Sequence, residues 1–158
     1  MLPAERIAAV LSEHSSIPAI GSHTLSILTT KGISHDHWRI GDSGLVLRVL
    51  RMSQWNMTSD QQLIYEATAF KRAAASGHCP RLHGVVQPCE GLPRGALIVD
   101  LIDGHPPWLS DDLVTIADAF TAIHQLPVPP PDEQPPLQIH TDPVAATLRV
   151  IEEQAAYI

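Results

Sequence analysis

The spacing of apolar residues along the chain predicts short helices and strands. A helix is expected from Pro3 to about His14, because Ile7, Val10 and Leu11 fall on one of its faces. Three segments rich in alternating apolar and β-branched residues follow, at residues 23–29, 35–40 and 45–50. Because the connections between these segments are short, we expect them to form an antiparallel meander.

A longer helix and two further strands are predicted after the meander. The helix is expected to open at residues 58–60, with Ser59 and Gln62 in capping-box spacing, and to end at Gly77. Apolar side chains recur on one face of this helix, at Leu63, Ala67, Phe70 and Ala74. Two strands follow, at residues 82–86 and 96–102. The order of the elements predicts an α+β fold, a five-stranded antiparallel sheet with one packed helix.

Helices and a proline-rich connector are expected in the last third of the chain. Ser110 is predicted to cap a helix with apolar positions on one face, at Leu113, Ile116, Ala117, Phe120 and Ile123. Six prolines within residues 127–136 predict an extended connector. A final helix is expected from about Asp142, as N-cap, to Tyr157. Its apolar stripe predicts a packing partner in a further segment or in another subunit.

Composition narrows the classes of partner. An apolar fraction of 44% in 158 residues favours a folded chain, and a net charge of -7 disfavours nucleic acid and anionic membranes as partners. The sequence has no signal-peptide pattern and no apolar run of about 20 residues, so we expect a cytoplasmic protein. Cys79 and Cys89 favour free thiols over a disulfide. Six arginines between Arg39 and Arg94 mark the region where a phosphate-bearing ligand would bind.

Five segments occur in an order that points to a known family. They are residues 32–40, which read Gly32-Ile-Ser-His-Asp-His-Trp-Arg-Ile40, and residues 45–49, 66–69, 96–104 and 116–127. Together they resemble the aminoglycoside phosphotransferase and choline kinase-like family, which has the protein-kinase-like fold. The resemblance implies a kinase-like N-terminal lobe at residues 1–104, with a hinge at about 97–104. Residues 105–158 would then be the helical start of an incomplete second lobe.

The resemblance implies a phosphate site. Gly32, Ser34 and His35 would lie in a loop over the phosphates, with His35 where the family often has asparagine. Arg48 would contact the α and β phosphates and pair with Glu66. The residues alone also require a partner or water for Arg48, because a charge among apolar neighbours is costly to bury. Without the resemblance, Gly32 and Ser34 are ordinary turn residues, Arg48 lies on a half-exposed strand face and Glu66 lies on a solvated helix face.

The hinge would hold the base of ATP or GTP. The resemblance implies binding through the carbonyl of Asp100 and the amide of Ile102, with Val99 at the back of the pocket. Taken by itself, the segment also fits a buried strand that ends in an Asp-Gly turn. His35 and His37 share a strand face, but no further ligands stand at useful spacing, so we favour a surface pair over a metal site.

Phosphoryl transfer needs more than a nucleotide site, because it requires a catalytic carboxylate and ligands for magnesium. The catalytic-loop pattern of the resembling family, H-G-D-x-x-x-x-N, does not occur in this sequence. We therefore expect the nucleotide-binding portion of a small-molecule phosphotransferase, inactive alone, with ATP or GTP and Mg in the complete enzyme. The acceptor would bind mainly to the second lobe. The alternative is a non-catalytic binding module of the same fold that forms a homodimer through its C-terminal helix.

Overall fold

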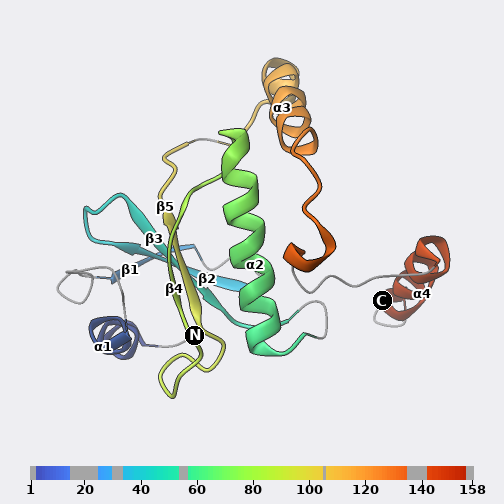
Figure 1. The fold of residues 1–158 in the computed structure, drawn as a ribbon. Helices are drawn as coiled ribbons and strands as arrows, with labels where there is room; N and C mark the ends of the chain where they lie inside the picture. Colours follow the sequence, from blue (N-terminus) through green and yellow to red (C-terminus); the bar gives the residue numbers. More distant parts are fainter. Residues whose placement is uncertain are drawn as a thin grey trace.

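A five-stranded antiparallel sheet forms the centre of the structure (Figure 1). The computed structural model describes residues 3–14, 25–29, 34–53, 57–104, 106–134 and 142–155. The strands are β1 (Leu25–Thr29), β2 (His35–Ile40), β3 (Leu45–Leu50), β4 (Leu82–Val86) and β5 (Ala96–Asp100). They lie in the order β1-β2-β3-β5-β4, and each neighbouring pair is antiparallel. The α+β class and the five-stranded sheet expected from the sequence are confirmed.

Four α-helices accompany the sheet in the described part of the chain. They are α1 (Ala4–His14), α2 (Ser59–Ala73), α3 (Leu109–His124) and α4 (Pro143–Ala155), with the 3-10 turns η2 (Ala74–Ser76) and η3 (Pro131–Glu133). α2 runs along one face of the sheet, whereas α3 and α4 lie beyond it (Figure 1). None of the described helices is long and apolar enough to cross a membrane.

The first three strands form the predicted meander. Trp38 of β2 pairs with Leu47 of β3, and Leu47 pairs with Ile98 of β5. Because paired side chains share a face and successive ones alternate, these three residues point to one face of the sheet and Arg48 points to the other. The sheet therefore has two chemically different faces, each with its own helix.

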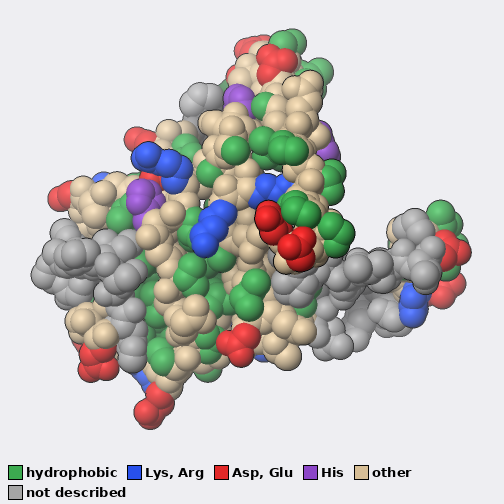
Figure 2. All heavy atoms as spheres, viewed as in Figure 1, with side chains coloured by type: hydrophobic (Ala, Val, Ile, Leu, Met, Phe, Trp, Pro, Cys, Tyr) green, Lys and Arg blue, Asp and Glu red, His purple; other side chains and the backbone are tan. Residues whose placement is uncertain are grey.

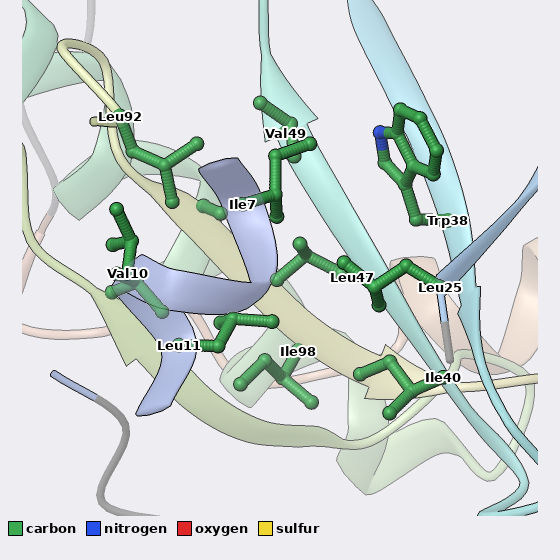
Figure 3. Close-up of a cluster of buried hydrophobic side chains, with 12 residues drawn as sticks. Ile7, Val10, Leu11, Leu25, Trp38, Ile40, Leu47, Val49, Leu92 and Ile98 are labelled. Atoms are coloured by element: carbon green, nitrogen blue, oxygen red, sulfur yellow. The ribbon is translucent and has the colours of Figure 1, made fainter. Parts of the chain in front are cut away.

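α1 covers the first face through an apolar cluster (Figure 3). Ile7 and Leu11 of α1 are almost fully buried in this cluster, together with Leu47 and Ile98 of the sheet. Burying a side chain of this size stabilises the fold by about 1.5–3 kcal/mol relative to leaving it exposed. The apolar face predicted for the first helix is confirmed, and its burial holds α1 against the sheet.

α2 covers the second face through a separate cluster. Leu63 and Ala67 of α2 are buried there with Val46 and Leu97 of the sheet, and Phe70 packs against them. The apolar stripe predicted for this helix is confirmed in these three positions. Polar side chains on the second face of the sheet are therefore enclosed between β-strands and α2.

The capping box of α2 lies one residue before its predicted position. The Thr58 hydroxyl accepts from the Gln61 amide at 3.2 Å, and the Gln61 side chain accepts from the Thr58 amide at 3.0 Å. The predicted box of Ser59 and Gln62 is wrong, because Gln62 is buried and donates to Glu66 instead.

Two other helix boundaries follow their sequence signals. Gly77 has a φ of 77° and ends η2, which extends α2 by one turn. Asp142 Oδ1 accepts from the amides of Val144 and Ala145, each at 3.0 Å. The prediction of Asp142 as the N-cap of the last helix is thus confirmed.

α3 begins before its predicted cap. It starts at Leu109, so Ser110 lies inside the first turn and the cap predicted there is wrong. Asp112 Oδ2 accepts from the Trp108 amide at 2.9 Å and satisfies a terminal donor from within the helix. The proline-rich connector at 127–136 contains the turn η3 in its described part, so it is less extended there than predicted.

Gly95 is expected to tolerate no side chain. Its φ is 70°, and a Cβ there would lie 2.5 Å from the backbone oxygen of Val86. We expect Gly95→Ala to lower the free energy of unfolding by about 2–3 kcal/mol, because conformation and contact both oppose it. Gly44→Ala is the control, since Gly44 has a φ of 72° but no atom within 4 Å of its added Cβ. Equal losses in urea unfolding of the two variants would contradict the steric argument.

Candidate functional site

Arg48 lies in the middle of the sheet, on the face that α2 covers. Its strand, β3, has β2 on one side and β5 on the other. Its chain neighbours Leu47 and Val49 belong to the cluster under α1, so the guanidinium is directed to the opposite face. The side chain is 28% exposed, and its guanidinium carbon lies 5.6 Å from the centre of the Phe70 ring. A charge enclosed to this degree requires polar partners.

Glu66 of α2 supplies the opposite charge. Its Oε2 lies 3.5 Å from Arg48 Nε, and its side chain is only 12% exposed. Gln62, one helical turn earlier, donates to Glu66 Oε1 at 3.0 Å. The structure therefore brings together the two residues that the family resemblance pairs, and Glu66 does not lie on a solvated helix face.

Two histidines of β2 complete a hydrogen-bond network with this pair. Arg48 Nη1 donates to His37 Nε2 at 3.1 Å, and Arg48 Nη2 donates to His35 Nδ1 at 3.2 Å. A guanidinium can only donate, so both of these ring nitrogens accept. His35 then carries its proton on Nε2, which donates to Glu66 Oε2 at 2.8 Å. We call Arg48, His35, His37, Gln62 and Glu66 the Arg48 network.

The expectation of a surface pair for His35 and His37 is wrong. His35 is 8% exposed, and both of its ring nitrogens are engaged inside the Arg48 network. The two residues share a strand face as predicted, but α2 covers this face, and the local pattern does not reveal that. Within the described residues, no group of three or more His, Cys, Asp or Glu side chains could hold a metal ion.

Burial and hydrogen bonding decide the charges in the Arg48 network. Burial by itself would raise the pKa of Glu66, but hydrogen bonds from His35 and Gln62 and the positive charge of Arg48 outweigh it, so this pKa is lowered. The pKa of His37 is also lowered, first by burial and then by the charge of Arg48. Near neutral pH, the network therefore holds an ionised Glu66 and a neutral His37.

The Arg48 network also contains donors without acceptors. His37 accepts at Nε2, so its proton lies on Nδ1, and this buried atom has no hydrogen-bond partner among the described residues. Arg48 Nε is buried too and makes no hydrogen bond in this part of the chain. An unsatisfied buried donor costs about 1–3 kcal/mol. An anion that reached these N–H groups would recover part of that cost, because charge-assisted hydrogen bonds are the stronger kind.

The predicted phosphate-loop residues are only partly described. Gly32 lies outside the described residues. Ser34 is 9% exposed, and its carbonyl accepts from the Arg51 amide at 2.8 Å, which ties it to the chain after β3. His35 is the first residue of β2, and its ring belongs to the Arg48 network.

The predicted hinge residues lie farther along β5. Asp100 stands three residues beyond the position that pairs with Arg48, a separation of about 10 Å along a strand. Val99 is 5% exposed and belongs to the cluster under α2, whereas Ile102 is 64% exposed. The strand ends at Asp100 and not at Ile102 as predicted. The structure thus places the hinge residues near one another, toward the end of β5 and beyond the position that pairs with Arg48.

The carboxylate of Asp100 is held by β4 and the residue before it. His83 Nε2 lies 2.6 Å from Asp100 Oδ1, and the Arg81 amide and Nε donate to Oδ2 at 2.9 and 3.2 Å. These contacts, that of His83 first, lower the pKa of Asp100 to about 2. No local pattern reveals this cluster, because Arg81 and His83 lie far from Asp100 along the chain. A ligand at the hinge would therefore meet backbone groups of Asp100 and not a free carboxylate.

Comparison with known proteins gives the chain no family. No protein-family model, curated protein or solved structure matches it. The resemblance of its segments to the phosphotransferases therefore stays a prediction, and function must be inferred from the geometry and charge of the site.

The Arg48 network should make stability depend on pH. The lowered pKa of His37 means that the unfolded chain takes up a proton below about pH 6.5 that the folded chain resists, so the free energy of unfolding should fall on acidification through that range. The lowered pKa values of Glu66 and Asp100 should extend the fall to more acidic pH. We expect His37→Gln to flatten the dependence between about pH 7 and 5 in urea unfolding. The exposed His78→Gln is the control, and an unchanged slope in His37→Gln would contradict the assignment.

Proposed function

We propose that the chain binds ATP or GTP as the kinase-like N-terminal lobe of a small-molecule phosphotransferase. The observation that carries the proposal is the Arg48 network, in which a cation from the central strand meets a carboxylate from α2, which packs on that face. Kinase-type phosphotransferases use a strand cation and a helix glutamate in this way to position phosphates. The order of the five family-like segments supports the same function.

Arg48 is suited to a phosphate in both charge and position. Its guanidinium makes one hydrogen bond with each histidine, which leaves further N–H groups on Nη1 and Nη2, and its side chain is 28% exposed. Two contacts fix the orientation of the guanidinium before a ligand binds: His35, which is held by Glu66, and the ring of Phe70. An arginine offers two parallel donors to a phosphate, where a lysine would offer a point charge.

The base of the nucleotide would bind at the end of β5. Val99 is buried in the cluster under α2, and Ile102 lies in the exposed segment that follows the strand. Because the carboxylate of Asp100 is held by His83 and Arg81, recognition would fall to the Asp100 carbonyl and the Ile102 amide. A base at the hinge and phosphates at Arg48 would extend the nucleotide along β5 and β3. Ser34, next to His35 of the Arg48 network, would lie toward the phosphate end.

The proposal concerns binding and not phosphoryl transfer by this sequence alone. A catalytic carboxylate, magnesium ligands and the acceptor site would come from a second lobe. ATP-dependent phosphorylation of an alcohol or an aminoglycoside by this chain alone would contradict that division.

Nucleotide binding can be measured by thermal unfolding with ATP or GTP and magnesium. A ligand at 100 times its dissociation constant should add about 2.7 kcal/mol to the free energy of unfolding. Arg48→Gln should weaken nucleotide binding by roughly tenfold to a hundredfold, because it removes a charge-assisted contact. Arg39→Gln is the matched control, since Arg39 lies on the neighbouring strand and pairs with the exposed Asp42. Equal affinities for the two variants, or no shift with either nucleotide, would overturn the proposal.

A second candidate function is a binding module that forms a homodimer through α4. The apolar stripe of this helix is exposed, with Val144, Leu148 and Ile151 at 67%, 55% and 58% of their full surface. Hydrophobic side chains are visible on the surfaces of both α3 and α4 (Figure 2). Contiguous exposed apolar surface of this kind is typical of interaction sites.

If the chain forms a homodimer through α4, its apparent molecular mass in sedimentation equilibrium should rise with protein concentration. Leu148→Asn should shift the equilibrium toward monomer, because it removes an apolar contact from the stripe. The neighbouring Arg149→Asn changes a polar position on the same helix and should leave the mass unchanged. A wild-type chain that stays monomeric at about 100 μM, a range in which weak transient interfaces associate, would exclude this candidate.

A further inference from the structure

A second polar site lies at the end of β3. A cavity of about 430 Å³ opens where β3 ends, between the connection of β4 to β5 and the start of α2. Its walls are formed by the apolar residues Val49, Leu50, Leu92 and Pro93 and by the polar residues Asp36, Arg51, Ser59 and Arg94. A cavity of this volume is within the range of small-molecule sites, and the mixture of walls favours an amphipathic ligand.

This cavity is distinct from the Arg48 network. Asp36 lies between His35 and His37 in β2, so its side chain points to the opposite face of the sheet. Val49 belongs to the apolar cluster under α1, and so does Leu92 (Figure 3). Leu50 belongs to the cluster under α2, so side chains from both faces of the sheet line the cavity, but no residue of the Arg48 network does.

Asp36 is the first recognition group of the cavity. The residue is 2% exposed, and its Oδ1 has no hydrogen-bond partner among the described residues. Arg51 Nη1 lies 3.6 Å from that oxygen, which offsets its charge without a hydrogen bond. A buried carboxylate oxygen without a donor is costly, so a ligand that supplies an N–H group would be stabilised there.

Arg94 is the second recognition group. It is half-buried on the cavity wall and makes no hydrogen bond or ion pair with the residues that the structure describes. A guanidinium is suited to a carboxylate, with which it forms two parallel hydrogen bonds. A ligand that fits the cavity would therefore carry an N–H donor for Asp36 and a carboxylate for Arg94.

We propose that the cavity binds a free hydrophobic α-amino acid. Its ammonium would donate to Asp36, its carboxylate would accept from Arg94, and its side chain would lie against the apolar walls at Val49, Leu50, Leu92 and Pro93. Burial of a side chain the size of leucine would stabilise the complex in addition to the two polar contacts.

The experiment uses three matched probes on the full chain. L-leucine carries both polar groups, 3-methylbutylamine lacks the carboxylate, and 4-methylpentanoate lacks the ammonium. In amide NMR titrations, we expect L-leucine to shift the signals of cavity residues such as Leu92 and Gly95. Each analogue should bind about tenfold or more weakly, because it leaves one buried partner unpaired. Equal binding of all three probes, or no shifts with L-leucine or L-phenylalanine, would overturn the proposal.

Two variants separate the recognition groups. Arg94→Gln should weaken the binding of L-leucine about tenfold or more and leave that of 3-methylbutylamine unchanged. Asp36→Asn should weaken L-leucine and leave 4-methylpentanoate unchanged. Asp36 is buried, so the Asp36→Asn variant can unfold. The decisive variant is therefore Arg94→Gln at the cavity wall, with Arg39→Gln as its control. An Arg94→Gln chain that binds L-leucine like the control would reject the site.

Discussion

A positive charge in the middle of a sheet is the constraint around which the α2 face is organised. Arg48 lies on β3, between two other strands, and its side chain is only 28% exposed. Such a charge is tolerated in a fold only when other groups compensate for its lost hydration. β2 contributes two histidines, and α2 contributes Glu66 with Gln62 beside it. The position and orientation of α2 on the sheet thus serve two purposes, because the same helix buries an apolar stripe and delivers the carboxylate.

The alternation of β2 links this constraint to the other face of the sheet. His35 and His37 enter the Arg48 network, while Asp36 between them points to the other face and lines the cavity at the end of β3. Four consecutive residues of β2, His35 to Trp38, therefore serve a cation site, a carboxylate site and an apolar cluster. The strand can carry all three because each face has its own helix, and the two polar groups never compete for the same space.

Several features could be predicted from local pattern, and each depends on residues close in sequence. The strands, the apolar stripes at Ile7 and Leu63, and the cap at Asp142 follow from spacing and from local hydrogen bonding. The errors arise where distant partners intervene. The Ser59 cap moved to Thr58 because Gln62 is used by Glu66, and the surface histidine pair became part of a buried network because α2 covers β2.

The sequence by itself determined the α+β class, the order of strands and helices, and the fact that Arg48 needed a partner, because periodicity and the cost of a buried charge are local properties. Only the tertiary structure decided which residues are the partners of Arg48. His35, His37 and Glu66 reach Arg48 because β2 pairs with β3 in one register and α2 crosses that face. Asp36 and Arg94 share a cavity for the same reason, since residues far apart in the chain are brought together by strand pairing and helix packing.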